Sequence, residues 1–363
     1  MSGAPECGKL ECGKLEFGIF HEFPSLPGRS HADAFDQAFA LVDDAERWGL
    51  DVMWLAELHF DPARAVLSAP LVVAAAIAAR TTRMKIGLAV QVLPLAPPLR
   101  LAEEAATVDQ ISKGRLIFGV GRSGVARTYE AYGIPYAESK DRFNESLEVI
   151  RKAWGSERVA HQGRFYQFDE VVVVPKPYQQ PMPPIRIAAA STDTFAAIGE
   201  LGFPIFVAVR YETAEEILPW LNVYRAAWKK AGHPGDGEVH LRVPGYIAAT
   251  EAAAFEEPRE SLMHFFGQQA RLISDSAARL KLPPTDRRSL TAKRLRELTY
   301  EQALAGTILV GTPDEVTRRL HRLKDQLGLS GVMLELNCGG RIPHEKVSTA
   351  LRLLCQEVMP QFR

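Results

Sequence analysis

Apolar positions along this chain follow two different spacings. The run LEFGIF (15–20) is apolar at alternate or adjacent positions, whereas DAFDQAFALVDDAERWG (33–49) places Phe35, Phe39 and Val42 three or four residues apart. The first pattern is typical of a buried strand and the second of one helix face that ends at a glycine. A strand followed by a helix is therefore predicted for residues 15–49.

The same strand and helix unit recurs along the rest of the chain. With LEFGIF, the predicted strands are DVMWLAEL (51–58), MKIGLAVQVL (84–93), RLIFGVG (115–121), PIRIAAA (184–190), PIFVAV (204–209), HLRVPGYIAA (240–249) and GVMLELN (331–337). Nearly continuous apolar runs are expected where both faces of a parallel sheet are buried. About eight such strands close a (β/α)8 barrel, so we predict an α/β fold with a single TIM barrel over residues 15–363.

Two segments depart from this alternation. Residues 159–184 contain a predicted hairpin and a proline-rich loop, inserted before the fifth strand. Residues 275–300 are polar and basic and show no apolar stripe in their first half, which predicts an irregular, mobile lid loop over the pocket. Its basic residues Arg287, Arg288 and Lys293 are expected to stay solvated rather than to meet a ligand.

Composition narrows the classes of function. The chain has 363 residues, 47% of them hydrophobic, and a formal charge of -1 with both signs interspersed. This balance predicts no binding of nucleic acid or of an anionic membrane, and favours a small-molecule substrate. No apolar run reaches the roughly 20 residues of a membrane span, and MSGAPECGKL lacks the apolar core of a secretory signal.

The four cysteines, Cys7, Cys12, Cys338 and Cys355, are too few for a disulfide scaffold, and we predict a cytoplasmic protein. Cys7 and Cys12 belong to a tandem repeat, ECGKL ECGKL, with no further ligands nearby for a metal. We predict that residues 1–14 form a duplicated, disordered leader and that the protein holds no metal.

The segment RLIFGVGRSGVART (115–128) contains glycines with the spacing GxGxxG, at Gly119, Gly121 and Gly124. In a dinucleotide-binding Rossmann fold this loop lies in the first strand–helix unit and leads directly into a helix. Here three units precede it, and Gly133 interrupts any helix that follows. We interpret the segment as a barrel strand that reaches the C-terminal mouth, where Arg122 faces an anion.

Polar residues also follow two other predicted strands. Glu57 and His59 end the second strand, and polar groups there are costly unless they are paired or face solvent or a ligand. Both are site candidates, and a structural histidine bonded to Glu57 is the alternative. Ser191 and Thr194 follow the fifth strand, where a helix N-terminus offers free N–H groups to an anion, although Ser191 could also be a plain N-cap.

Three stretches connect the chain to a known family: WLAELHF (54–60), KIGLAVQVLPLAPPLRLAEEAATVDQISKGRLIFGVGR (85–122) and VGTPDEV (310–316). From Leu15 to the C-terminus the sequence resembles the bacterial-luciferase-like, flavin-dependent monooxygenases, including the inserted hairpin and the lid. Members of this family are single (β/α)8 barrels that bind reduced FMN at the C-terminal mouth.

The resemblance implies roles for individual residues. Arg122 with the Ser123 backbone matches the turn that holds the FMN phosphate, and the segment AAASTDTF completes the phosphate site with Ala190, Ser191 and Thr194. Ala89 and Val90 match a non-prolyl cis peptide beneath the flavin ring. Part of the apolar substrate wall is expected from Phe20, Trp54 and Leu58.

One departure from the family bears on the chemistry. Luciferases carry two consecutive histidines where this chain has Leu58 and His59, and Leu58 cannot transfer a proton. Light emission from a long-chain aldehyde is therefore not expected. Oxygenation through a flavin C4a-hydroperoxide remains the implied reaction, with His59 as proton donor or acceptor beside Glu57.

The resemblance also implies partner molecules and leaves two alternative functions open. Reduced FMN and O2 react at the site with an aldehyde, ketone or similar small molecule, and a separate NAD(P)H-dependent flavin reductase supplies the reduced FMN. The alanine-rich helix APLVVAAAIAAR (69–80) corresponds to the family's dimer interface, which implies a homodimer. The alternatives are a deazaflavin-dependent dehydrogenase of the same superfamily and a non-catalytic flavin-binding subunit.

Overall fold

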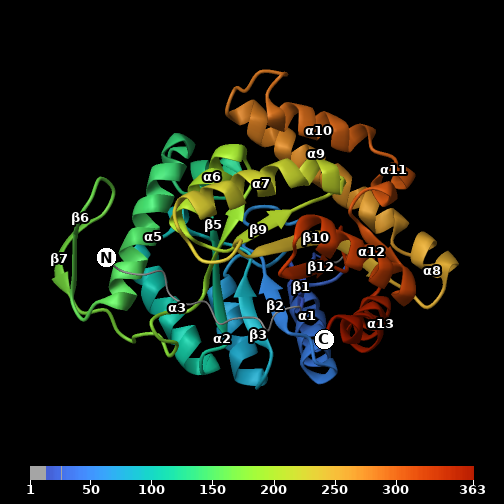
Figure 1. Ribbon diagram of the computed structural model, residues 1–363, viewed down its shortest axis with the longest axis horizontal. Coiled ribbons are helices and arrows are strands. Elements are labelled where there is room, and N and C mark those ends of the chain that lie inside the picture. The colour runs from blue at the N-terminus through green and yellow to red at the C-terminus, as the bar shows by residue number, and fades with distance from the viewer. Residues whose placement is uncertain (1–13, 26) are drawn as a thin grey trace.

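A closed ring of parallel strands forms the centre of the computed structural model, which describes residues 14–25 and 27–363 (Figure 1). The pairing of β9 with β10 and of β12 with β1 closes the ring. Its strands are, in order, β1 (Glu16–His21), β2 (Val52–Leu55), β3 (Lys85–Leu88), β5 (Leu116–Gly121), β8 (Ile185–Ala189), β9 (Ile205–Ala208), β10 (Val239–Ile247) and β12 (Gly331–Glu335). The predicted (β/α)8 barrel is confirmed, while the predicted leader lies outside the described residues except for Lys14.

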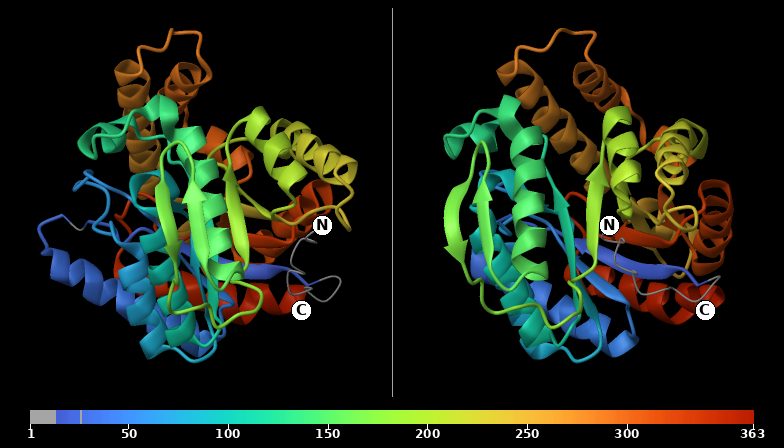
Figure 2. Two further views of the ribbon diagram at one scale, coloured as in Figure 1. Left: turned by 90° about the vertical axis from the view of Figure 1, so that its left-hand side faces the viewer. Right: turned by 60° about the vertical axis from the view of Figure 1, so that its left-hand side comes forward.

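Helices surround the ring on the outside, as Figures 1 and 2 show. The principal ones are α1 (His31–Trp48), α2 (Pro70–Arg80), α3 (Pro98–Ser112), α5 (Ser139–Gly155), α6 (Thr192–Leu201), α7 (Ala214–Lys230), α12 (Pro313–Leu327) and α13 (His344–Leu353). Two shorter strands extend the sheet locally, since β4 (Gln91–Val92) pairs with β5 and β11 (Leu309–Gly311) pairs with the end of β10. Within the described residues, no helix is both long and apolar enough to cross a bilayer.

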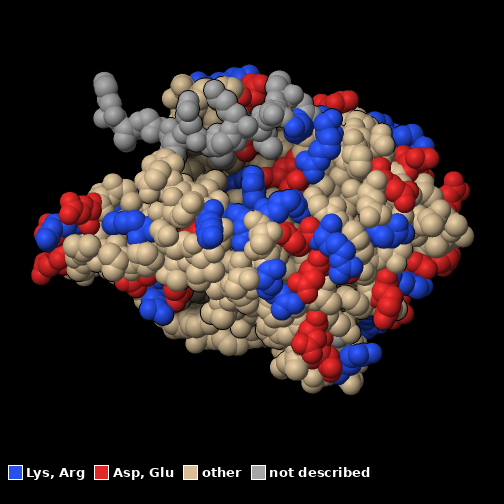
Figure 3. All heavy atoms as spheres, turned by 90° about the horizontal axis from the view of Figure 1, so that it is seen from below, with Lys and Arg blue, Asp and Glu red and all other residues tan. Residues whose placement is uncertain are grey.

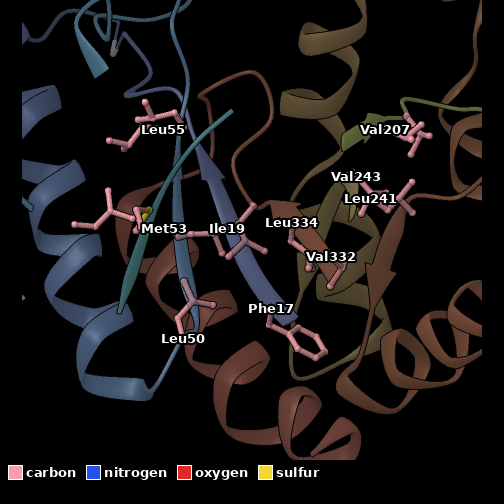
Figure 4. Close-up of a cluster of buried hydrophobic side chains, with 14 of the residues drawn as sticks. Phe17, Ile19, Leu50, Met53, Leu55, Val207, Leu241, Val243, Val332 and Leu334 are labelled. Atoms are coloured by element: carbon pink, nitrogen blue, oxygen red, sulfur yellow. The ribbon is translucent and has the colours of Figure 1, made fainter. Parts of the chain in front are cut away.

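Alternate residues of each barrel strand pack into two separate hydrophobic cores. Outward-facing side chains such as Phe17, Ile19 and Met53 pack in the large cluster between the strands and the outer helices (Figure 4). Inward-facing side chains form a second, smaller cluster that fills the barrel, made of Phe20, Val52, Trp54, Ala56, Ile117, Phe206 and Met333. The continuous apolar runs in the sequence arise because both faces of every strand are buried.

The inserted hairpin is present as predicted and lies outside the barrel. Its strands β6 (Val159–Gln162) and β7 (Gln167–Val171) pair antiparallel and lie beside α5 (Figure 2). His161 Nε2 lies 3.2 Å from the Glu145 Oε1 of α5, which fastens the hairpin to that helix.

The segment 275–300 is mostly helical, in contrast to the irregular loop expected from its polarity. It comprises the end of α9 (Arg259–Arg279), a short connection and α10 (Arg287–Glu297), and the two helices pack side by side. The two helices need only small apolar faces to pack against each other, because Ala277, Ala292 and Leu295 are buried between them. Asp286 caps α10 by accepting a hydrogen bond from the backbone N–H of Arg288 at 2.8 Å. That the segment 275–300 moves as a lid remains a prediction.

Basic and acidic side chains are interspersed over the face shown in Figure 3, without a large patch of one sign. This distribution agrees with the near-zero formal charge of the whole sequence.

A buried ion pair lies near the N-terminal end of the barrel interior. Arg186 Nη1 of β8 lies 2.5 Å from the Glu16 Oε1 of β1, and His240 Nδ1 of β10 lies 3.6 Å from the same oxygen. Burial alone would raise the pKa of Glu16, but the charges of Arg186, His240 and Lys85 and the hydrogen bond from Arg186 together outweigh burial and lower that pKa to about 2. The pair thus stabilises the fold only while Glu16 is ionised.

Two glycines make room for Trp54 inside the barrel. A Cβ atom on Gly87 would lie 2.1 Å from the Trp54 ring, and one on Gly18 would lie 2.5 Å from it. We predict that Gly87→Ala lowers the free energy of unfolding by ~1–3 kcal/mol because it overpacks the interior. Urea denaturation measures this, with Gly267→Ala on α9, which meets no atom within 4 Å, as a control that is neutral or stabilising. Equal stability of the Gly87→Ala protein and the wild type would contradict this packing.

The pH dependence of stability tests the Glu16 pair. We predict that Glu16→Gln lowers the free energy of unfolding at pH 7 by about 3 kcal/mol, since the folded pKa of about 2 lies below the ordinary value of 4.5. This difference is full above pH 4.5 and shrinks as the pH falls toward 2. Glu104→Gln, which breaks an exposed pair with Arg100 on α3, is the control and should change little. A difference that does not vary with pH would argue against the pair.

Candidate active site

A cavity of about 170 Å3 lies at the C-terminal mouth of the barrel. Residues from the ends of β1, β2, β3, β5, β9, β10 and β12 line it, and Phe265, Gln269 and Leu272 of α9 cover it. In TIM barrels this end carries the active site, because the loops that follow the strands converge there. Phe265, Gln269 and Leu272 precede the predicted lid segment 275–300, no residue of which lines the cavity.

Six of the twelve predicted site residues line this cavity, namely Phe20, Glu57, Leu58, Ala89, Val90 and Ser123, whereas His59, Arg122, Ala190, Ser191 and Thr194 do not. Trp54 does not line it either, which corrects its assignment to the substrate wall. It is fully buried in the barrel interior, with its ring 5.0 Å from the Phe206 ring and 5.2 Å from the Arg186 guanidinium. Successive residues of a strand rise steadily toward its C-terminal end, so Trp54 in β2 lies deeper in the barrel than Leu58, which follows the strand.

The expected cis peptide is present between Ala89 and Val90, directly after β3. Both residues line the cavity, and the Ala89 N–H donates to the Leu55 carbonyl of β2 at 2.8 Å. The backbone at this point thus faces the space in which a ligand ring would lie.

The Arg122 turn follows β5 and leaves the Arg122 guanidinium with few contacts. Ser123 has a φ of 59°, in the left-handed region, and the Tyr129 hydroxyl donates to the Arg122 carbonyl. The Arg122 side chain makes one long hydrogen bond, from Nη1 to Ser139 Oγ at 3.4 Å, and no ion pair with any described residue. The short helix α4 (Ala126–Ala131) follows the turn, where no helix was expected. Because β5 is the fourth strand of a closed ring, the GxGxxG spacing is still not a Rossmann loop.

Ser191 occupies the N-cap position of α6 without capping it. Its side chain makes no hydrogen bond to the helix backbone, and Oγ lies instead 2.7 Å from Thr194 Oγ1. The plain N-cap interpretation is therefore wrong, and the first turn keeps N–H groups and two hydroxyls for an anion. Since β5 and β8 are paired in parallel, Arg122 and Ser191 follow neighbouring strand ends.

Two arginines of α10 are not simply solvated, in contrast to the expectation. Arg287 donates to the Ala190 carbonyl, beside Ser191, and Arg288 donates to the Tyr136 hydroxyl. Lys293 is exposed on the same helix, 4.0 Å from Glu297. The α10 helix is thus attached to the rim where Ala190, Ser191 and Arg122 lie.

Glu57 and His59 form a hydrogen-bonded pair at the end of β2. His59 Nε2 lies 2.8 Å from Glu57 Oε1, and the other oxygen, Oε2, accepts from Gln91 Nε2 at 2.6 Å and from the Val92 N–H at 2.8 Å. Burial raises the pKa of Glu57. His59 Nδ1 lies 3.3 Å from the Tyr132 hydroxyl, so both ring nitrogens have partners. Of the two side chains, only Glu57 is in the cavity wall.

The sequence analysis missed a charged cluster in the same wall. It consists of Glu22 after β1, Arg64 in the loop between β2 and α2, Arg210 after β9, Arg242 in β10 and Glu335 at the end of β12. Three of these positions, Glu22, Arg210 and Glu335, share the signal that identified Glu57, a charged residue at or near the end of an apolar run. In the sequence analysis, polar residues at the ends of apolar runs were considered as site candidates only after β2, β5 and β8.

Comparisons with known proteins agree with this geometry. The family model for luciferase-like monooxygenases matches residues 15–330. The oxygenase component of flavin-dependent trigonelline monooxygenase from Acinetobacter baylyi is 26% identical over 332 residues, which cover 90% of each chain.

Two solved structures share the fold. The oxygenating constituent of 3,6-diketocamphane monooxygenase from Pseudomonas putida, in complex with FMN, has a TM-score of 0.78 at 22% identity, covering 96% of this chain and 99% of that one. The coenzyme F420-dependent tetrahydromethanopterin reductase from Methanopyrus kandleri has a TM-score of 0.73 at 19% identity, covering 96% and 100%. The barrel, the mouth cavity and the family match together show that this chain is an enzyme of the luciferase-like, flavin-dependent monooxygenase family.

Proposed function

We propose that the protein is the oxygenase of a two-component system, which uses reduced FMN and O2 to oxygenate a small organic molecule. The observation that supports this proposal is that the Arg122 turn and the uncapped start of α6, with Ser191 and Thr194, follow the neighbouring strands β5 and β8. Ser191 leaves the helix N-terminus uncapped, and Arg122 has no carboxylate partner among the described residues. A single phosphate group matches both features.

In this proposal Arg122, Ser123, Ala190, Ser191 and Thr194 hold the FMN phosphate, and the Ala89–Val90 peptide lies beneath the flavin ring. Bound reduced FMN supplies the activation of O2. The chain itself orients the ring and excludes water, through the apolar wall at Phe20, Leu58, Val209 and Phe265 and the cover provided by α9.

Glu57 is the proposed proton donor or acceptor, because it is the member of the Glu57–His59 pair in the cavity wall. Its raised pKa keeps the carboxyl protonated to a higher pH than an exposed glutamate, as a general acid requires. His59 positions the carboxyl through its 2.8 Å contact with Oε1.

The rival cofactor is coenzyme F420, which the structurally similar Methanopyrus kandleri enzyme uses. FMN is favoured here because the rim offers one compact anion site rather than a long basic groove. The separate NAD(P)H-dependent reductase follows from the similarity to an oxygenase component. Homodimerisation is supported by α2, on which Val72 is 71% exposed, and the cytoplasmic location stays a prediction.

Arg122→Ala tests the cofactor site. We predict that it weakens FMN binding by ~2 kcal/mol, or about 30-fold, because a charge-assisted hydrogen bond to the phosphate is lost. Flavin fluorescence titration measures the dissociation constant, with Arg100→Ala on the outer helix α3 as an unaffected control. Tight F420 binding without FMN binding, or an unchanged constant for Arg122→Ala, would remove this assignment.

Glu57→Gln tests the proposed role of Glu57 as a general acid. We predict that it lowers the turnover of substrate-dependent oxygen consumption by ~100-fold or more, while FMN affinity is unchanged. The wild-type rate should fall as the pH rises through the raised pKa of Glu57, and the variant should lack this ionisation. If the variant retains both the rate and the pH profile, Glu57 is a structural residue.

A further inference from the structure

The charged residues in the cavity wall fall into pairs with one exception. Arg64 Nε donates to Glu22 Oε2 at 2.8 Å, and Arg242 Nη2 donates to Glu335 Oε2 at 2.6 Å. The third glutamate of the wall, Glu57, is paired with His59. Three carboxylates are thus matched by two arginines and a histidine, and the third arginine of the wall, Arg210, is left over.

No side chain of a described residue forms a hydrogen bond with the Arg210 guanidinium, although the carboxylate of Glu212 lies close enough to interact with its charge. The neighbouring carboxylate of Glu212 is engaged by backbone N–H groups, from Arg210 at 2.7 Å and from Tyr211 at 3.1 Å. Burial lowers the pKa of Arg210 most, and the positive charges of Arg242 and Arg64 lower it further, while the negative charge of Glu212 acts in the opposite direction.

Arg210 is half-buried in the cavity wall and has no hydrogen-bonded side-chain partner, so its guanidinium can bind an anion in the cavity. Charged groups are found in low-dielectric sites when they are paired, and a planar guanidinium binds a carboxylate through two parallel hydrogen bonds. The FMN phosphate already has its own proposed site at Arg122 and Ser191. Arg210 instead follows β9, on the side of the mouth that Val209, Phe265 and Leu272 make apolar.

We propose that Arg210 binds a carboxylate of the substrate, so that this oxygenase acts on a small organic acid with an apolar body. The inference rests on the proposed function for the identity of the reaction, but the binding site is a property of the chain. A carboxylate is favoured over a phosphate because one unpaired guanidinium offers a single positive charge and one planar pair of donors.

The experiment compares matched acids and amides as probes of the full-length protein, with and without FMN. The pairs are benzoate with benzamide and octanoate with octanamide, and dissociation constants come from thermal shift and intrinsic fluorescence. At least one acid should bind 10-fold or more tightly than its amide in the wild type. Arg210→Gln should abolish this preference, and Arg210→Lys should retain part of it because it keeps the charge but loses the fork.

Arg271→Gln is the matched control. It removes the same charge from α9 near the mouth, but its side chain is 62% exposed, pairs with Asp61 and does not line the cavity. It should leave the preference for acids intact. Urea denaturation of each variant establishes that it is folded before binding is compared.

The possible results separate the two proposals. Equal binding of acids and amides by the wild type, or a preference that survives Arg210→Gln, overturns the carboxylate site. So does an Arg210→Gln variant that loses FMN affinity and keeps the preference, because Arg210 would then face the charge of the reduced flavin ring. Failure of FMN to bind the wild type overturns the proposed function alone, since the acid preference is also measured without FMN.

Discussion

A charge inside a barrel is costly unless it contacts an opposite charge, and this constraint pairs most of the charged side chains from the floor to the mouth. Glu16 and Arg186 satisfy it near the N-terminal end, where their contact of 2.5 Å joins β1 to β8. Glu22 with Arg64, and Glu335 with Arg242, satisfy it at the C-terminal mouth. Because buried ions that lose a partner are strongly destabilising, these pairs fix the strand ends around the cavity.

Between the ion pair near the N-terminal end and the ion pairs at the C-terminal mouth, the barrel interior is apolar. Trp54 and Phe206 fill the barrel there, and the missing side chains of Gly18 and Gly87 give the indole its space. The floor therefore keeps water and charge from passing through the barrel, and the chemistry is confined to the mouth. At the mouth itself, Arg122, Arg210 and Glu57 are the groups whose pairing leaves capacity for a ligand or a proton.

Much of this arrangement could be predicted from the sequence. Eight apolar runs sufficed for the barrel because both faces of every strand are buried. The Arg122 turn, the Ser191 helix start and the Ala89–Val90 peptide were found through the family resemblance, and the structure brings them to one rim. Their role in binding FMN is a proposal.

Other features depend on tertiary contacts that a pattern does not contain. The polar segment 275–300 is helical because a few small residues pack between α9 and α10, so its low hydrophobicity was misleading. Trp54 and Leu58 belong to the same strand–loop segment, and only the depth along the barrel separates floor from cavity wall. Arg210 becomes notable only when every neighbouring carboxylate is seen to have another partner.

The most direct test of the central claim is a crystal structure of the protein with FMN. The account predicts that the phosphate lies within hydrogen-bond distance of the Arg122 guanidinium and of Ser191 at the start of α6, with the flavin ring over the Ala89–Val90 peptide. A phosphate bound at Arg210, or a flavin outside the mouth cavity, would contradict it.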